Sequence, residues 1–254
     1  MNYGMYVSAS GVLTSLYRQD IHANNLANIN TAGFKPEITT TVAREAARVE
    51  DGLAHLPSNL MLERLGAGVL LAPNRVSTEQ GALERTGEPL DLAIEGEGFF
   101  VIGTPDGPRL SRDGRLTVNA DGLLVQAASG MPVLDASDET IRLDPRRPVT
   151  VASDGTLSQG GPGGGVRLGF VAVDAAGLRK IGDNLLEAPP AAMNARRAPT
   201  GRVHQGAIER SAVDPIKAML GVTSAATAVT NNARMIQLFD DLMNRTISTF
   251  ARMA

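Results

Sequence analysis

The clearest helix signal in the chain lies in residues 214–252, which read DPIKAMLGVTSAATAVTNNARMIQLFDDLMNRTISTFAR. Apolar residues recur in this stretch at alternating steps of three and four, which is the spacing of one face of an α-helix. Asp214 and Pro215 suit the N-cap and the first helical position, where proline is tolerated. The stretch therefore predicts one uninterrupted helix from Pro215 to Arg252, about 57 Å long at a rise of 1.5 Å per residue.

The N-terminal segment shows the same spacing over residues 5–26, with Gln19 as the one polar position. We call the apolar positions of the two segments the predicted seam, and we expect them to pack helices against one another and against neighbouring subunits. The predicted seam consists of Met5, Ala9, Val12, Leu16, Ala23, Leu26, Met219, Val222, Ala226, Val229, Ala233, Ile236, Met243, Ile247 and Phe250. The alternative is a stripe that faces only the core of its own domain. A helix of the C-terminal length extends past a small domain, so part of this seam needs a partner helix or another subunit to cover it.

Glycine and proline divide the rest of the chain. Residues 66–210 hold 22 of the 27 glycines, residues 1–35 contain no proline, and residues 211–254 contain only Pro215. Both residue types interrupt helices, so the pattern predicts helices at the two ends and β structure between them. We expect an α+β fold, with residues 1–35 and 211–254 in a terminal helical coiled-coil domain, 36–75 as an irregular connector, and 76–210 as a β-rich middle domain. The middle domain should be mostly antiparallel, like a sandwich or barrel.

Local signals support β structure in the middle domain. Asp-Gly pairs occur at 106, 113, 121 and 154, and the pair at 121 lies between the apolar runs 116–118 and 123–125. This arrangement is the strongest short-range signal for a β-hairpin. Residues 160–165 (GGPGGG) are typical of a flexible loop tip.

Composition excludes several classes of function. The 24 Lys and Arg against 27 Asp and Glu leave no basic excess to bind nucleic acid. The chain has no cysteine and three scattered histidines, so we expect no metal site and no cofactor. It has neither an apolar run long enough for direct membrane insertion nor the features of a cleaved signal peptide.

No catalytic motif is recognisable. The sequence lacks a nucleophile elbow, a phosphate-binding P-loop and the His-Glu-x-x-His zinc motif. Glu95 and Glu97 flank Gly96 after an apolar strand, and Asp91 lies nearby, but loop carboxylates are far more often structural. We therefore expect no catalytic residue and no enzyme activity.

The segment that follows the first predicted helix contains Asn24, Asn25, Leu26, Ala27, Asn28, Thr31, Gly33, Phe34 and Lys35. Four further motif-like stretches lie at residues 86–100, 112–114, 121–125 and 205–215. In this order, the stretches resemble the bacterial flagellar hook and rod protein family, with the first of them as its N-terminal signature. Ala212 and residues 227–231 depart from the family pattern.

The resemblance implies a basal-body rod subunit that forms a hollow drive shaft between motor and hook and lines the export channel. It implies paired terminal helices around that channel, and export by the flagellar type III apparatus without a cleaved signal. The implied partners are copies of the chain and other rod and hook subunits, in a rod that spans the periplasm. Both proximal and distal rod subunits share these motifs, and residues 66–69 (GAGV) favour the distal one.

Two alternatives remain open at this stage. One is a hook-type axial protein of the same family, although a length of 254 residues suits a rod protein better. The other is a secreted adhesin or carbohydrate-active enzyme with a β domain and helical ends.

Overall fold

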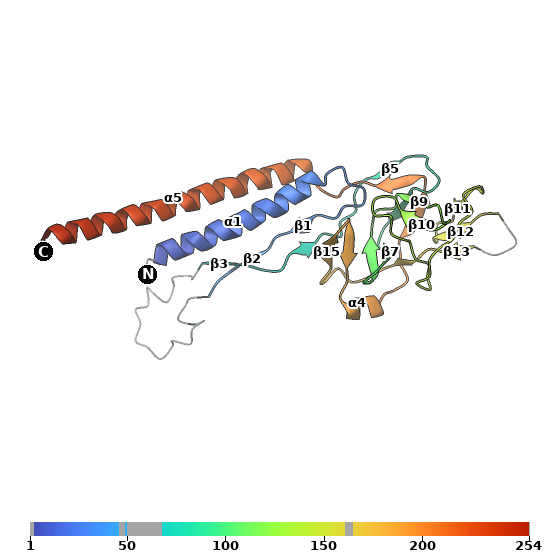
Figure 1. The fold of residues 1–254 in the computed structure, drawn as a ribbon, viewed down its shortest axis with the longest axis horizontal. Coiled ribbons are helices and arrows are strands. Elements are labelled where there is room, and N and C mark those ends of the chain that lie inside the picture. Colours follow the sequence, from blue (N-terminus) through green and yellow to red (C-terminus); the bar gives the residue numbers. More distant parts are fainter. Residues whose placement is uncertain (1–2, 46–48, 50–67, 161–164, 254) are drawn as a thin grey trace. The chain divides into compact units, whose positions relative to one another are not determined.

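The computed structural model describes residues 3–45, 49, 68–160 and 165–253, and the chain divides into two compact units. The first, which we call the helical unit, comprises Met1–Leu26, Thr39–Asn74 and Pro215–Ala254. The second, which we call the β unit, comprises Ala27–Ile38 and Arg75–Asp214. Both units are therefore built from segments that are far apart in the sequence (Figure 1).

Two long helices form most of the helical unit. Helix α1 spans Tyr3–Ala27 and helix α5 spans Pro215–Met253. They pack together in antiparallel directions, because Gly4 faces Phe239 at one end of α1 while His22 faces Gly221 near the other. The uninterrupted C-terminal helix predicted from Pro215 is confirmed.

The expected connector, residues 36–75, contains short strands where it is described. In the helical unit, β2 (Thr41–Ala43) pairs with β3 (Val69–Leu71). In the β unit, β1 (Glu37–Ile38) pairs with β4 (Arg75–Val76). Positions 66 and 67 of the stretch that favoured a distal subunit lie outside the described residues.

The largest sheet of the β unit has five antiparallel strands in the order β14-β7-β8-β16-β15. In chain order these strands are β7 (Phe99–Thr104), β8 (Gly107–Ser111), β14 (Phe170–Val171), β15 (Arg179–Gly182) and β16 (Leu185–Glu187). The short helix α4 (Pro190–Asn194) follows β16. The expectation of a mostly antiparallel middle domain is confirmed.

Smaller antiparallel pairings surround this sheet. They join β6 (Leu92–Glu95) to β17 (Arg202–Gln205), β5 (Leu83–Arg85) to β18 (Ala207–Glu209), β9 (Leu116–Val118) to β10 (Leu124–Gln126), and β12 (Thr156–Ser158) to both β11 (Thr150–Val151) and β13 (Val166–Arg167). The β9–β10 pair is the hairpin predicted around Asp121-Gly122. Gly122 has a φ of 77° there, a conformation that glycine adopts without strain. Residues 161–164 of the expected loop tip lie outside the described residues.

Strand β7 is buried on both faces and separates two hydrophobic clusters. Phe100 and Ile102 belong to the larger cluster, whereas Phe99 and Val101 belong to the smaller one. This division follows from the alternation of side chains along a strand. The rings of Phe100 and Phe170 lie 6.5 Å apart at 42° in the larger cluster, within the usual range for a tilted aromatic pair.

Candidate functional site

The two long helices approach each other through glycine. A Cβ atom at Gly4 would overlap the ring of Phe239, one at Gly11 would lie 2.9 Å from Asn232 Oδ1, and one at Gly221 would lie 2.6 Å from His22 Nδ1. All three separations are too short for a real side chain. The pair therefore depends on these glycines for its close packing.

The contact face between the helices lies one residue before the predicted seam. Ser8, Ser15, Ala218 and Ala225 are buried, and each immediately precedes a seam position. Small residues on this face let the two helices approach, and the larger side chains of His22, Asn232 and Phe239 lie against its glycines. The seam's larger side chains are displaced from this contact by about a quarter of a helical turn.

The seam residues are consequently not buried in the single chain. Those that are exposed are Leu16, Ala23, Met219, Met243 and Ile247. Those that are half-buried are Met5, Ala9, Val12, Leu26, Val222, Ala226, Val229, Ala233 and Ile236. The side chain of Phe250 lies outside the described residues. The described part of the chain therefore leaves these seam side chains at least partly exposed to solvent.

Helix α5 extends beyond the part that contacts α1. Phe239 lies against Gly4, close to the start of α1, and residues 240–249 are all exposed. We call α5 from residue 240 onward the overhang. Its exposed side chains include Leu242, Met243 and Ile247. Sequence reasoning missed Leu242, which lies off the predicted seam.

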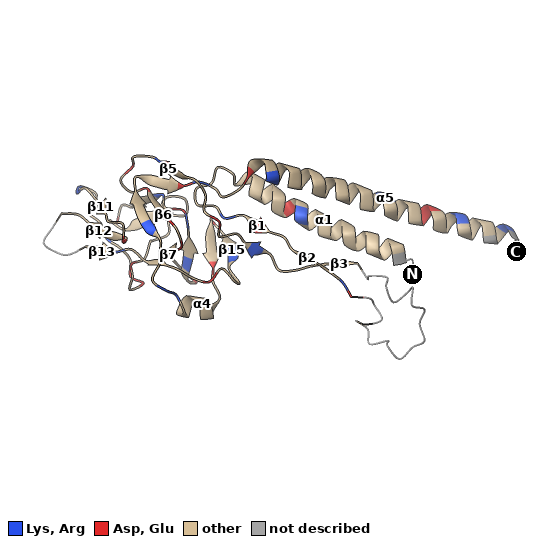
Figure 2. Cartoon of the chain, turned by 180° about the vertical axis from the view of Figure 1, so that it is seen from behind, with Lys and Arg blue, Asp and Glu red and all other residues tan. Residues whose placement is uncertain are grey.

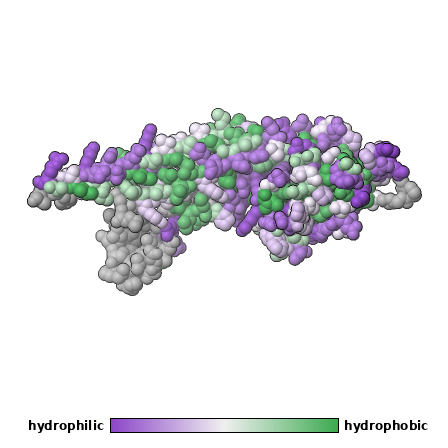
Figure 3. Space-filling view, in the orientation of Figure 1, coloured by the Kyte–Doolittle hydropathy of each residue, from purple (hydrophilic) through white to green (hydrophobic). Residues whose placement is uncertain are grey.

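Both helices carry few charges, as Figure 2 shows. Residues 3–17 and 218–233 contain no Lys, Arg, Asp or Glu at all. On the face drawn in Figure 3, hydrophobic residues gather over the helical unit. Tyr6, Leu13 and Leu238 add to this exposed apolar surface, again off the predicted seam. Extended apolar surfaces of this kind mark sites of protein–protein contact.

The family-like signature leads from α1 into the β unit. Leu26 is half-buried and Ala27 exposed, Asn24 is exposed and Asn25 is buried. The hydroxyl of Thr31 donates a hydrogen bond to Asn28 Oδ1 at 3.0 Å, which closes the turn after the helix. Gly33 has a φ of 65°, and a Cβ atom there would overlap the backbone carbonyl of Arg112.

Phe34 and Lys35 then bury their side chains in the β unit. The ring of Phe34 is covered by Lys180, whose Nζ lies 3.5 Å from the ring centroid. Lys35 is 2% exposed, and its Nζ donates to the backbone carbonyl of Glu79 at 2.6 Å. Burial lowers the pKa of Lys35, although the nearby carboxylate of Glu209 acts in the opposite direction.

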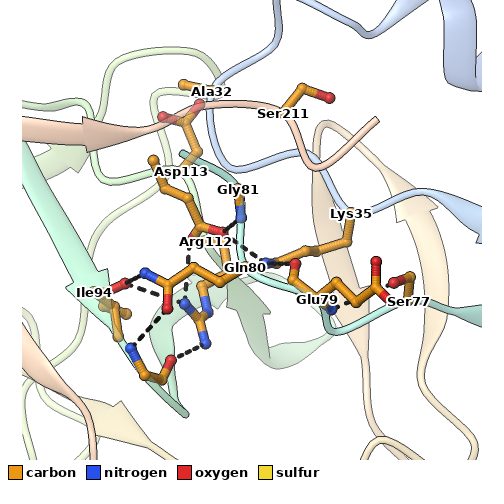
Figure 4. A network of polar contacts seen from close by, with 12 residues as sticks. Ala32, Lys35, Ser77, Glu79, Gln80, Gly81, Ile94, Arg112, Asp113 and Ser211 are labelled. Atoms are coloured by element: carbon orange, nitrogen blue, oxygen red, sulfur yellow. Dashed lines mark hydrogen bonds and ion pairs between the residues drawn. The ribbon is translucent and has the colours of Figure 1, made fainter. Parts of the chain in front are cut away.

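Glu209 is the centre of a buried charged cluster. Its carboxylate accepts hydrogen bonds from Lys35 Nζ at 2.6 Å, from Arg112 Nη1 at 3.0 Å and from the backbone N–H of Gly81 at 2.8 Å. The side chains of all three charged residues are at most 4% exposed. Figure 4 shows Lys35 and Arg112 within this network.

Arg112 also holds the end of β6. Its Nη2 donates to the carbonyl of Gly96 at 2.7 Å, and its Nη1 reaches the carbonyl of Ile94 at 3.3 Å. Gln80 binds the same two residues through its side-chain amide (Figure 4). Arg112 and Glu209 both lie in family-like stretches, but the sequence alone does not predict that their side chains form an ion pair.

The carboxylates considered for catalysis lie in ordinary structural surroundings. Glu95 Oε2 lies 2.6 Å from His204 Nε2, and both side chains are about half exposed at the rim of an open cavity of about 810 Å³. Asp91 forms a β-bridge with Arg115, and Glu97 is exposed. Within the described part of the chain, no group of His, Asp and Glu is arranged to hold a metal ion. None of the helices described is both long and apolar enough to cross a bilayer.

Three family models match the chain in order. Residues 5–35 match the flagella basal body rod protein, residues 93–159 the flagellar hook protein FlgE/F/G D1 domain, and residues 204–249 the flagellar basal body rod FlgEFG protein C-terminal model. The first and third cover most of the two helices, and the second lies within the β unit.

Curated relatives match over nearly the whole chain. The flagellar basal-body rod protein FlgF of Caulobacter vibrioides is 36% identical over 248 residues, which covers 93% of each chain. The rod protein FlgG of Agrobacterium fabrum is 31% identical, with 93% of this chain and 95% of the relative covered. FlgG of Bacillus subtilis is 28% identical, with 96% and 97% covered. The chain therefore belongs to the flagellar basal-body rod protein family, as a structural subunit of the flagellum.

Proposed function

We propose that the chain polymerises through its helical unit into the hollow drive shaft that transmits torque from motor to hook and lines the export channel. In this proposal the predicted seam packs one subunit against the next and gives the assembled helices coiled-coil character. The β unit, with hydrophobic clusters on both faces of β7, closes as a sandwich or barrel and makes no part of the seam.

The proposal rests on one observation: the overhang of α5 carries exposed apolar side chains that the described part of the chain does not cover. Its residues 240–249 are exposed and include Leu242, Met243 and Ile247. Fully burying one such side chain contributes roughly 1.5–3 kcal/mol. A second subunit is the simplest source of that burial, because the chain belongs to a family named for a polymeric structure.

The same proposal assigns partners and location. The subunit contacts copies of itself and other rod and hook proteins, and it reaches a periplasm-spanning rod through the flagellar type III export apparatus without a cleaved signal. It acts as a structural part with no catalytic role and binds no nucleic acid. A hook-type role is not favoured, since the relatives described above are named as rod proteins.

The test places a carboxylate on the overhang. Ile247→Asp should leave the unfolding of the purified monomer unchanged, because Ile247 is 60% exposed there. It should abolish incorporation into basal bodies and hence motility, because the assembled contact would bury an unpaired charge. Incorporation is measured by immunoblotting purified basal bodies from cells that carry only the variant.

Arg245→Asp is the matched control, since it places the same side chain two residues earlier on an exposed position of α5. It should assemble far better than Ile247→Asp. Normal incorporation of Ile247→Asp would show that this part of the seam does not face a packed neighbour.

A further inference from the structure

The two chain segments that connect the β unit to the helices lie side by side within the β unit. One is residues 31–35, which follow α1, and the other is residues 209–212, which precede α5. The N–H of Gly33 donates to the carbonyl of Glu209 at 2.7 Å, and the N–H of Ala212 donates to the carbonyl of Phe34 at 3.1 Å. The backbone thus pairs the two connections directly.

The buried charges join the same two connections through their side chains. Lys35 belongs to the first connection and Glu209 to the second, and they are bonded at 2.6 Å although 174 residues separate them. Arg112 and the N–H of Gly81 bind the same carboxylate from the β unit. The carboxylate of Glu209 therefore links the two connections to each other and to the rest of the β unit.

We propose that Lys35, Glu209 and Arg112 form a latch that positions the two connections, so that α1 and α5 leave the β unit from fixed points and can pair for assembly. The three act as positioning residues, and this inference rests on the proposed role of the helices in the shaft. Five residues separate Ala27, the end of α1, from Gly33, and two separate Ala212 from Pro215, the start of α5. Chain segments this short keep each helix end within reach of the latch.

A contribution to stability alone does not account for this arrangement. Taking charges out of water is costly, and well-packed apolar residues of similar volume commonly stabilise a protein as well as a buried ion pair does. Charged hydrogen-bonding groups add geometric specificity, because each bond forms only with a suitable partner at a defined distance and angle. Here the selected partners come from the two connections.

Because the latch holds two cations and one carboxylate, its positioning role can be tested separately from its contribution to stability. Two cations share one carboxylate, so Lys35→Met leaves a neutral Arg112–Glu209 pair, whereas Glu209→Gln leaves two buried cations without the carboxylate that both of them bind. We therefore expect Lys35→Met to loosen the connections while the β unit stays folded. Glu209→Gln should destabilise the whole unit.

The experiment is amide hydrogen exchange, resolved by NMR, on the full-length monomer. In Lys35→Met, the amides of Gly33 and Ala212 should exchange at least about tenfold faster than in the parent, as expected for local opening. Core amides that bond within the β unit, such as those of Val101 and Leu124, should keep their rates. Arg210→Met is the control, because Arg210 forms an exposed ion pair with Glu84 next to the latch. It should change none of these rates.

The parent chain offers a second measurement that needs no variant. In low concentrations of denaturant, the amides of Gly33, Gly81 and Ala212 should open together with one shared free energy, below that of the core. Separate opening of these three amides would overturn the latch. So would an equal acceleration of the latch and core amides in Lys35→Met, because the cluster would then serve stability only.

Measuring incorporation into basal bodies distinguishes the positioning role of the latch from the proposed function of the helices. Lys35→Met should reduce incorporation into basal bodies even though the overhang is intact. If Lys35→Met loosens the connections and yet assembles normally, the positioning role is wrong while the proposed function stands. If Ile247→Asp assembles normally, the proposed function fails whatever the exchange rates show.

Discussion

Two glycines of the β unit, Gly33 and Gly130, share a left-handed backbone conformation but differ in their surroundings. Gly33 combines a φ of 65° with close contact to the carbonyl of Arg112. Gly130 has nearly the same φ, 70°, but open space around it. The two glycines therefore separate the effect of backbone conformation from the effect of crowding.

Gly33→Ala should lower the free energy of unfolding of the β unit by about 3 kcal/mol or more, since the new methyl group adds a backbone clash to the strain of a left-handed conformation. Gly130→Ala should cost only the conformational part, about 1–2 kcal/mol. Chemical denaturation followed by circular dichroism measures both. Equal losses in the two variants would show that the contact with Arg112 does not constrain position 33.

Lys180 gives the β unit a pH dependence. Burial lowers its pKa to about 8 from an ordinary value of 10.5, and among the described residues no hydrogen-bond acceptor reaches its Nζ. Below pH 8 the ammonium is charged in the folded and unfolded states, and the folded state carries the full desolvation cost. Between pH 8 and 10.5 the folded state loses the proton first, so the contribution of Lys180 to stability rises with pH.

Lys180→Met should remove this rise and stabilise the protein at pH 7 by roughly 1 kcal/mol, after allowance for solvent around the partly exposed side chain and for the favourable contact with the Phe34 ring. The measurement is the difference in unfolding free energy between parent and variant at pH 7 and pH 10. A constant difference across this range would mean that Lys180 keeps an ordinary pKa.

Helices α1 and α5 pair where a glycine of one helix accommodates a larger side chain of the other, as Gly221 accommodates His22. Glycine inside a helix normally costs about 0.5–1 kcal/mol relative to alanine. Gly221 is kept at this cost because a Cβ atom would lie 2.6–2.8 Å from the ring of His22. The benefit of close packing between the helices outweighs the lost helix propensity.

Gly221→Ala should therefore lower the helical content and the melting temperature of the helical unit, although alanine has a higher intrinsic helix propensity than glycine. Ser224→Ala, at an exposed position of the same helix, should leave both unchanged or raise them slightly. Circular dichroism at 222 nm on the full-length monomer distinguishes the two. A rise in helicity for Gly221→Ala would show that the two helices do not approach through this glycine.

At the scale of the whole molecule, the two units differ in what they bury. The β unit contains both hydrophobic clusters, whereas the helical unit leaves long apolar side chains exposed. Ordering a residue costs roughly 1–2 kcal/mol of backbone entropy. A helix pair that leaves its apolar side chains exposed offsets little of this cost unless neighbouring subunits cover them. We expect the isolated monomer to have a stable β unit and labile ends.

Limited proteolysis tests this expectation. A resistant fragment should begin between about residues 36 and 80 and end near residue 210, by the distribution of glycine and proline. After cleavage between residues 39 and 74, the segment 27–38 should stay bound to the fragment. Its contacts include the carbonyl of Pro36 with the N–H of Ser77 and the N–H of Gly33 with Glu209. Equal resistance of the full-length chain would contradict the expected difference between the units.

Features that depend on near neighbours along the chain can be predicted from the amino-acid sequence. The start of α5 at Pro215, the hairpin at Asp121-Gly122 and the division into helical ends and a β-rich middle all follow from propensity, periodicity and the placement of glycine and proline. These signals act over a few residues, so a linear reading captures them. The family-like stretches likewise indicate the family from the linear sequence alone.

Which surfaces and charges meet depends on the tertiary structure. The predicted seam follows the larger apolar side chains, but α1 and α5 contact each other through the neighbouring face. How closely two backbones approach depends on both helices together, so neither helix sequence alone shows it. Lys35 and Glu209 are 174 residues apart, and each alone is an ordinary charged residue in a linear reading. Their burial in one cluster depends on the folding of the whole β unit around them, which supplies Arg112 and the N–H of Gly81.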